Sequence, residues 1–292
     1  MAVLYGDLHV DEKYAGILEP NLYHNSVFAA GKTFTDKYQI GPAGGIFVRK
    51  LRTTPVEVGT PGRDFQDEKT QDDLIPIVLN NNYQKSKKIY GVQAAAVQTP
   101  LANAQLSLAT QECGEGWNQS GIACLITEGT VSEKSTAITK SNLKEQLLAE
   151  RASIVKNKGK ANVVLCHPDF YAKVLEAAGD QYTPQLNEYM NKNAQVGTWL
   201  GFLFIETSGL AEGTVAPKYY DYTGALKTVS VEELALVDFI MYNHEALSIL
   251  TNFDTARIVD SENFSGSKAQ VEMNSGFRVT SGVQVRVRKH AA

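Results

Sequence analysis

The sequence predicts an α+β fold, and three observations carry this prediction. The stretch from Ala161 to Leu210 has the pattern of a short strand, a capped helix and a pair of strands. Apolar residues recur at helical spacing in residues 94–126 and 142–158, whereas residues 269–288 have a strongly β character. Together these stretches indicate helices packed on sheets.

The composition is that of an ordinary globular protein. The chain has 292 residues, of which 43% are hydrophobic and 21% are charged, enough for one large domain or two modest ones. Its 28 Lys and Arg residues against 32 Asp and Glu residues give a net charge of −4, which does not demand a nucleic-acid partner. No apolar run reaches the ~20 residues that cross a membrane. Three cysteines without CxxC spacing, and no signal peptide, indicate synthesis in a reducing cytosol.

The N-terminal segment, residues 1–42, shows little periodicity. It carries too few apolar residues to offset its own ordering entropy, so we expect it to lie across another surface. An ordinary N-terminal strand and loop remains an equal alternative.

A projecting hairpin is expected next. Residues 44–52 and 74–79 have strand patterns, and residues 53–73 between them are rich in Pro, Gly and charged residues. Such a long connection without its own core is normally functional or mobile. A two-stranded projection is not stable alone, so a partner surface is implied, with a disordered surface loop as the alternative.

The longest helix is expected over residues 94–126. Apolar residues follow 4-3-4 spacing between residues 97 and 108, and an unbroken helix of this length would extend about 45 Å. Three glycines, each costing ~1 kcal/mol relative to Ala, predict a kink or two consecutive helices. They are Gly114, Gly116 and Gly121.

A second amphipathic helix is expected over residues 142–158, with Ser141 as its N-cap. In the stretch that follows, Pro168 next to Asp169 predicts a helix start, and Gly179 predicts its stop. We expect His167 at or near this N-cap. Two short apolar runs around Gly201 complete the unit.

The C-terminal part is predicted to be mainly β. Residues 235–250 are strongly apolar, and Val283, Val285 and Val287 alternate with polar neighbours as in a half-buried strand. Its basic residues favour a solvated strand face, with sequence-blind contact to a polyanion as the weaker alternative. They are Arg286, Arg288 and Lys289.

No catalytic, cofactor-binding or metal-binding residue is predicted. The histidines His9, His24, His167, His244 and His290 lie far apart without metal-ligand spacing. Gly31-Lys32-Thr33 lacks the upstream glycine and the following helix of a phosphate-binding loop. Cys166 and His167 are adjacent, so on a strand they face opposite sides, and Cys166 is better explained as a small core residue. A chain of this size without such a site is expected to be structural.

The order of elements resembles that of the major capsid proteins of tailed phages, which have the Hong Kong 97-like fold. The local match is the strand at residues 162–166, the helix at residues 168–178 and the run from Gly197 to Leu210. The ending, residues 276–287, is similar to the C-terminal strands of that family.

This resemblance implies a division of the chain by function. It places an N-terminal arm at 1–42, the hairpin called the E-loop at 43–82, a P-domain with a spine helix at 83–128 and 245–292, and an A-domain at 129–244. Some relatives join an E-loop lysine to a neighbouring asparagine. Lys69 lies in this loop, but no acceptor can be matched, so that bond is not predicted.

The resemblance further implies a protein that is not an enzyme, assembling with copies of itself as hexamers and pentamers into an icosahedral shell around phage double-stranded DNA. Expected partners are a separate scaffolding protein, a portal, and encapsidated DNA without sequence-specific contacts, with no membrane and no cofactor. The expected location is the virion, after synthesis in the host cytoplasm. Two alternatives stay open: an encapsulin-like nanocompartment that packages cargo enzymes, and an enzyme with an unrecognised site.

Overall fold

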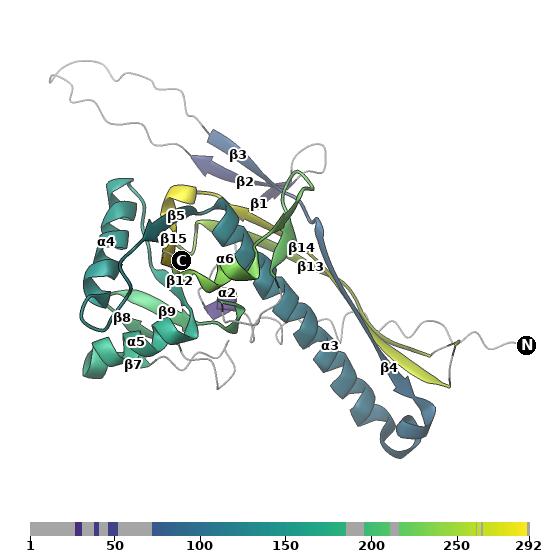
Figure 1. Ribbon diagram of the computed structural model, residues 1–292. Coiled ribbons are helices and arrows are strands. Elements are labelled where there is room, and N and C mark those ends of the chain that lie inside the picture. The colour runs from purple at the N-terminus through teal and green to yellow at the C-terminus, as the bar shows by residue number, and fades with distance from the viewer. Residues whose placement is uncertain are drawn as a thin grey trace, which may run out of the picture.

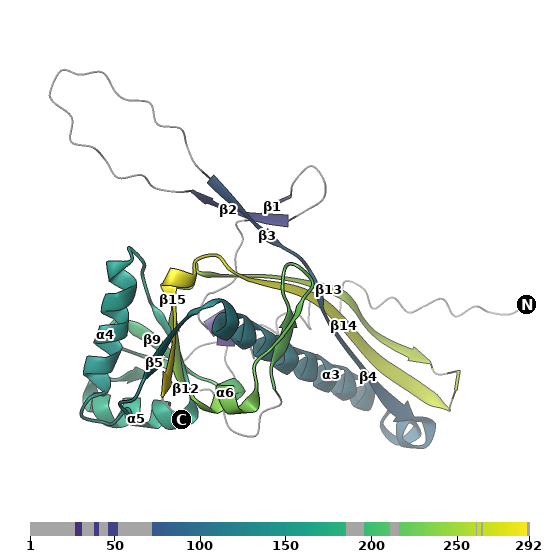
Figure 2. The ribbon, with the colours of Figure 1, turned by 45° about the horizontal axis from the view of Figure 1, so that its top comes forward.

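The computed structural model describes residues 27–30, 38–40, 46–51, 72–184, 196–210, 216–260, 262–263 and 265–290. In these residues, a long helix and long strands extend away from a layered α/β body, and a small three-stranded sheet projects on another side (Figures 1 and 2). The expected arm at 1–42 and the hairpin tip at 53–73 lie largely outside the described residues.

Helix α3 (Gly91–Glu128) runs unbroken through the three glycines, so the predicted interruption is wrong. At Gly121 the reason is close packing of a ring against the helix. A Cβ atom on Gly121 would lie 2.4 Å from the ring of Phe28, and one on Gly116 would lie 3.4 Å from the ring of Tyr83. At Gly121, the missing side chain lets an aromatic ring reach the helix backbone, and this packing offsets the low helix propensity of glycine.

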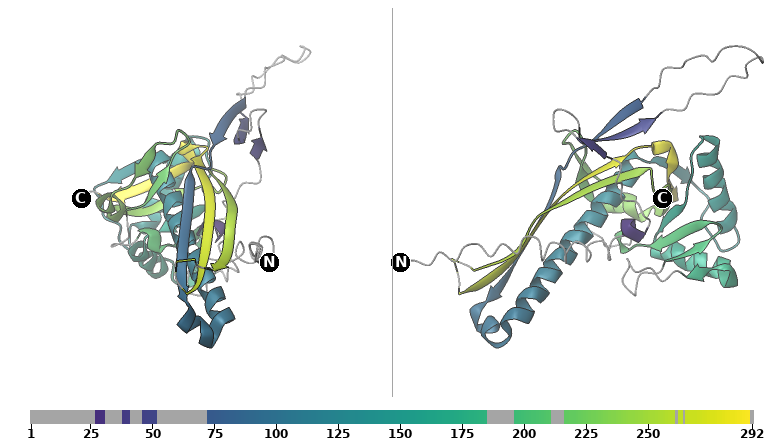
Figure 3. Two further views of the ribbon diagram at one scale, coloured as in Figure 1. Left: turned by 90° about the vertical axis from the view of Figure 1, so that its right-hand side faces the viewer. Right: turned by 180° about the vertical axis from the view of Figure 1, so that it is seen from behind.

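A three-stranded antiparallel sheet runs along α3, as the two views of Figure 3 show. Its strands, in order, are β13 (Leu247–Asp260), β14 (Gly266–Val279) and β4 (Asn81–Tyr90). Trp117 of α3 is fully buried between Phe28 of α2 (Val27–Ala30) and Phe277 of β14, with ring centroids 5.7 and 5.9 Å away. Its indole N–H donates to Thr251 Oγ1 at 3.1 Å. Aromatic packing with a satisfied indole thus joins helix and sheet.

The body is built on a seven-stranded mixed sheet in the order β5-β15-β12-β6-β9-β8-β7. One face, including Leu165, Ile240 and Val287, joins the core that contains α3. The other face, including Phe204 and Phe239, is covered by α4 (Leu143–Lys156) and α5 (Pro168–Ala178). The strands are β5 (Thr130–Lys134), β6 (Val163–Cys166), β7 (Thr183–Pro184), β8 (Val196–Trp199), β9 (Phe202–Glu206), β12 (Val237–Tyr242) and β15 (Val285–His290).

The strand–helix–strand unit predicted for residues 161–210 is confirmed. His167 is the N-cap of α5 and its Nδ1 accepts from Asp169 N at 3.2 Å, while Gly179 ends the helix with φ 49°. β8 and β9 form a hairpin whose turn residues, Leu200 and Gly201, both have positive φ (52° and 79°). Such a turn matches the twist of the flanking strands. The N-cap of α4 is Asn142 and not Ser141. The Asn142 side chain makes no capping bond to the helix, and its Oδ1 accepts instead from Thr139 N at 2.8 Å.

The last strand corrects two expectations. Val283 lies in a short 3-10 helix (η3, Gly282–Gln284), so the strand begins only at Val285. Arg288 and Lys289 are buried, with Arg288 0% exposed, so neither a solvated face nor a polyanion surface fits them. Arg288 Nη2 donates to Thr136 O at 2.9 Å, and Lys289 pairs with Glu233 of α6 (Val231–Ala235).

The expected strands at residues 44–52 and 74–79 are confirmed as β2 (Ile46–Leu51) and β3 (Asp72–Ile77), which pair antiparallel. β1 (Tyr38–Ile40) adds a third strand beside β2. The remaining elements are β10 (Lys218–Tyr220), β11 (Leu226–Thr228), η1 (Gly179–Gln181) and η2 (Ser208–Leu210).

Candidate functional site

The base of the projecting hairpin is held by two asparagines. Asn80 Nδ2 donates to Asp221 O at 2.8 Å. Asn81 exchanges two bonds with Tyr220: its Nδ2 donates to Tyr220 O at 3.1 Å, and its Oδ1 accepts from Tyr220 N at 2.7 Å. Asn81 is buried, so these bonds are shielded from water. The hairpin is therefore fixed where it leaves the body, through the β10–β11 pair.

Large apolar side chains are exposed around this base. Two belong to the hairpin strand β3 and the segment after it, and three belong to β10, β11 and the turn between them. Exposed apolar side chains on elements that the bonds of Asn80 and Asn81 hold together are candidates for a contact surface. We name them the hairpin-base patch: Leu74, Val78, Tyr220, Tyr222 and Leu226.

Glu128 joins three elements at the C-terminal end of α3. Its Oε1 accepts from Arg278 Nη1 at 2.9 Å and from the Tyr219 hydroxyl at 3.2 Å, and its Oε2 accepts from Val279 N at 3.0 Å. A negative charge at a helix C-terminus interacts unfavourably with the helix dipole. The hydrogen bonds from Arg278, Tyr219 and Val279 offset this cost for Glu128. Arg278 also stacks on Tyr222 of the hairpin-base patch, with its guanidinium carbon 4.0 Å from the ring centroid.

A second acidic residue, Glu112, connects α3 to β4. It pairs with Lys85, at 2.8 Å between Nζ and Oε2, and with Lys87. Hydrogen bonds from the two lysines hold the pKa of Glu112 below its ordinary value.

The sulfur and imidazole groups have structural roles in the described residues. Cys113, Cys124 and Cys166 are free and buried, and burial raises the pKa of the Cys166 thiol well above its ordinary value. Burial also raises the pKa of Cys113, to about 11. Such thiols stay protonated and are poor nucleophiles. Cys166 therefore fits the small core residue predicted for it.

The described histidines are each bonded to a polar neighbour. His167 caps α5, His244 Nδ1 lies 2.5 Å from Asn162 Nδ2, and His290 Nδ1 lies 3.1 Å from Asp238 Oδ1. His9 and His24 lie outside the described residues. The described part of the chain holds no group of three or more His, Cys, Asp or Glu residues that could bind a metal. Nor does it hold a helix long and apolar enough to cross a membrane.

Perturbed carboxylates are the signal that would favour an enzyme. Burial raises the pKa of Glu206, beside the hydrogen-bonded pair Tyr171 and Tyr182. Donors instead lower the pKa of Glu112, Asp221 and Glu272. In the described residues these groups are spread over different elements and do not converge on one pocket.

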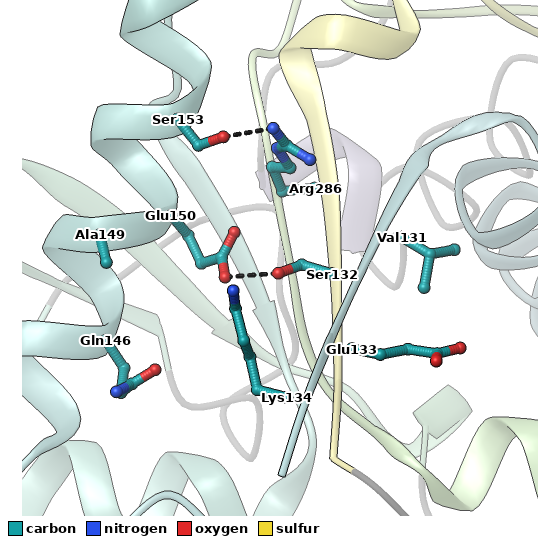
Figure 4. Close-up of a pocket in the computed structure, with 9 residues that line it drawn as sticks. All are labelled: Val131, Ser132, Glu133, Lys134, Gln146, Ala149, Glu150, Ser153 and Arg286. Carbon is teal, nitrogen blue, oxygen red and sulfur yellow. Dashed lines mark hydrogen bonds between the residues drawn. The ribbon is translucent and has the colours of Figure 1, made fainter. Parts of the chain in front are cut away.

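The described residues line at least two hollows. One, of about 280 Å³, lies between β4, α3 and the β10–β11 pair, with Tyr83, Tyr219 and Tyr220 in its wall. Another, of about 370 Å³, lies between α4 and the strands β5 and β15, and its lining is mainly polar (Figure 4).

Comparison with known proteins supplies the context for this arrangement. No family model and no curated protein matches the chain. The capsid structure of the cyanophage P-SCSP1u is similar with a TM-score of 0.58 and 11% identity, over 91% of this chain and 85% of that one. The mature capsid of bacteriophage PhiM1 gives 0.57 and 12%, over 91% and 87%. A virus-like particle from Pyrococcus furiosus gives 0.53 and 11%, over 96% and 99%.

These structures confirm the predicted fold. The chain has the α+β, Hong Kong 97-like fold of tailed-phage major capsid proteins. The residues that sequence reasoning missed are Asn80 and Asn81. A run of three asparagines, residues 80–82, directly follows the expected strand at residues 74–79 and is a turn signal, but nothing local reveals that two of them bind the β10–β11 pair.

Proposed function

We propose that this chain is the repeating subunit of an icosahedral shell that encloses the double-stranded DNA genome of a tailed phage. The observation that carries the proposal is the fold, which is similar to that of capsid subunits over most of the chain. The projecting hairpin supports the proposal. Its two strands and the short third strand bury little surface by themselves, so contact with a neighbouring subunit would stabilise them.

Assembly would cover what the single chain leaves exposed. The hairpin and the hairpin-base patch would lie against a neighbouring copy of the chain, and the residues 1–42 would act as an arm. A stable contact between proteins buries about 1,200–2,000 Å² in total. The anchoring by Asn80 and Asn81 would set the direction in which the hairpin reaches its neighbour.

The partners follow from this function. Copies would associate as hexamers and pentamers, with a separate scaffolding protein and a portal, after synthesis in the host cytoplasm. DNA would be held without sequence-specific contacts, in keeping with a net charge of −4. The residue ranges expected for arm, E-loop, P-domain and A-domain belong to the same proposal. In the structure, however, β15 pairs with β12 and β5, so the end of the range 245–292 shares a sheet with residues 130–242.

Electron microscopy of the purified chain, with and without its scaffolding protein, tests the proposal. We expect closed shells of uniform size. A discrete monomer or small oligomer under all conditions would count against it.

A substitution in the hairpin-base patch tests how the shell forms. Leu74 is 55% exposed, so Leu74→Asp is expected to leave the fold intact and to abolish or strongly reduce shell formation, because a charge would be buried at the contact. Val155→Asp is the matched control, since Val155 is 54% exposed on α4. Shell yield is measured by sedimentation, and folding by circular dichroism. Equal yields from both variants would remove the patch from the contact.

A nanocompartment that packages cargo enzymes is the second candidate. The specific observation in its favour is the match to a virus-like particle from Pyrococcus furiosus over 96% of this chain. The neighbouring genes discriminate between the two functions. Portal, terminase and protease genes would support the phage capsid, and a gene for a peroxidase or ferritin-like protein would support the compartment.

A further inference from the structure

The hollow between β4, α3 and the β10–β11 pair adjoins the hairpin-base patch. We name it the tyrosine hollow, after Tyr83, Tyr219 and Tyr220 in its wall. Tyr220 and Leu226 belong both to this wall and to the patch, and they are 44% and 50% exposed. The apolar surface of the patch therefore continues into the hollow, so a contact that covers the patch would also close the hollow.

The wall of the tyrosine hollow is mainly apolar. Three of its polar side chains are already bonded within the chain. Asn81 donates to and accepts from the backbone of β10, Asn82 Nδ2 donates to Glu272 Oε1 at 2.8 Å, and Ser120 Oγ donates to the backbone of β10 at 2.8 Å. An apolar space with satisfied polar neighbours offers few partners to water or to a polar ligand. The occupant that fits is apolar.

The size of the tyrosine hollow suits a single side chain. Sites for small-molecule ligands have volumes of about 300–1,000 Å³. The tyrosine hollow, at about 280 Å³, lies below this range. Aromatic rings pack favourably on one another, and contacts between proteins draw much of their energy from aromatic side chains that fill such pockets. An aromatic side chain of a partner therefore matches both the volume and the wall.

The projecting hairpin carries one aromatic side chain in the segment that joins its strands. This segment, residues 52–71, lies between the end of β2 and the start of β3. Phe65 is its only aromatic residue, and Val56 and Val58 are its only large aliphatic ones. So few apolar residues provide no core in which the Phe65 ring could be buried within the segment itself.

The hairpin carries Phe65 away from the tyrosine hollow of its own chain. β3 runs from Ile77, four residues before Asn81 of the wall, to Asp72, and its 6 residues cover about 20 Å. The seven residues from Asp72 back to Phe65 reach up to ~25 Å further. In Figures 1 and 2, β2 and β3 project from the body that contains α3. The segment is thus long enough to reach the hollow of an adjacent subunit.

Charge at the rim of the tyrosine hollow favours the same segment. Lys218 is exposed and is the one charged residue among the described residues of the wall. In residues 63–69, the three acidic residues Asp64, Asp67 and Glu68 outnumber the two basic ones. A lysine that meets acidic neighbours of the ring would help to orient the contact.

We propose that the tyrosine hollow receives the Phe65 side chain of a neighbouring copy of this chain. The ring would pack against Tyr83 and Tyr219, and Lys218 would face the acidic residues beside the ring. The proposal rests on the proposed shell function, and it names the contact through which the hairpin of one subunit is held by the next.

Cross-linking between mixed copies tests this contact. Copies with Gln66→Cys, which keep the Phe65 ring, are assembled with copies with Lys218→Cys and treated with a short thiol-specific cross-linker. The three native cysteines are buried, so the introduced thiols are the reactive ones. We expect a cross-link between the two kinds of copy, identified by mass spectrometry of the joined peptides. Val155→Cys in place of Lys218→Cys is the control and should give none, since Val155 is 54% exposed on α4.

The outcomes separate this contact from the shell function. Shells without the cross-link would overturn the contact and leave the shell function in place, whereas the absence of shells under all conditions would overturn both. The N-terminal segment also carries tyrosines, including Tyr14. A cross-link from Tyr14→Cys to Lys218→Cys, with none from Gln66→Cys, would assign the hollow to that segment and overturn the proposal.

Shell formation by a second pair of variants gives an independent test. Phe65→Ser should raise the subunit concentration needed for half-maximal shell formation by at least about tenfold, because an anchoring ring carries much of the energy of a contact. Val58→Ser, an apolar-to-polar change in the same segment, is the matched control and should change that concentration by less than about twofold. Sedimentation measures the shells, and circular dichroism checks folding. Equal effects of the two substitutions would overturn the proposal.

Discussion

At the scale of single residues, charged side chains in this protein join elements. Glu112 bridges α3 to β4 through Lys85 and Lys87, and Lys289 reaches Glu233 from a buried strand position. Some single-residue roles can be predicted from the sequence. His167 is predicted as a cap and Cys166 as a core residue, because each role depends only on neighbours in the chain. The burial of Arg288 is not predicted, because alternation shows which face of a strand is apolar but not what covers the polar face.

Removing the carboxylate of Glu112 is expected to have a pH-dependent effect. Its folded-state pKa is lowered from 4.5 by the two lysines, so the stability that it contributes is present above the unfolded pKa and is lost as the pH falls through the folded value. Glu112→Gln should thus lower the free energy of unfolding by about 0.5–1 kcal/mol at neutral pH. The difference from the unsubstituted chain should vanish in acid. Urea denaturation at neutral pH and in acid measures the free energy of unfolding, with Glu115→Gln on the exposed side of α3 as the control.

At the scale of elements, the effect of a glycine on helix continuity depends on tertiary packing as well as on intrinsic propensity. The three glycines of α3 predict an interruption from propensity alone, yet the helix continues, and at Gly121 the ring of Phe28 from α2 packs where a side chain is missing. This ring comes from a distant part of the sequence, so no local pattern could reveal it. By contrast, α5 carries its start and stop signals within its own sequence and was predicted correctly.

Two alanine substitutions in α3 should have opposite effects. Gly121→Ala would place a methyl group 2.4 Å from Phe28, so we expect a loss of about 1–3 kcal/mol in the free energy of unfolding. Gly116→Ala meets Tyr83 only at an ordinary contact distance of 3.4 Å, so the higher helix propensity of alanine should stabilise the protein by up to ~1 kcal/mol. Chemical denaturation measures both. Equal effects at the two positions would contradict this account of the unbroken helix.

At the scale of the whole molecule, the order of elements and the projecting hairpin were predicted, but the pairing of the sheets was not. Strand patterns show where strands occur, whereas the neighbours of β15 are set by contacts distant in sequence. Three of its parts, namely α3, the long sheet along it and the β10–β11 pair, meet at Glu128.

Glu128→Gln is therefore expected to destabilise the molecule as a whole. The amide retains one acceptor oxygen but loses the charge that pairs with Arg278, leaving that guanidinium and the Val279 N–H poorly satisfied. A loss of about 2–4 kcal/mol in the free energy of unfolding should follow, measured by urea denaturation. Glu245→Gln, a carboxylate outside this junction, is the comparison. A similar small loss in both variants would mean that Glu128 does not join the units.

The position of β15 has a consequence for how the protein is made. β15 lies between the edge strand β5 and β12, so the position between these two strands stays empty until residues 285–290 have left the ribosome. Until then β5, which pairs in this sheet with β15 alone, has no strand to join. Folding of the body is thereby delayed until synthesis has passed this point, as expected where pairing joins distant segments.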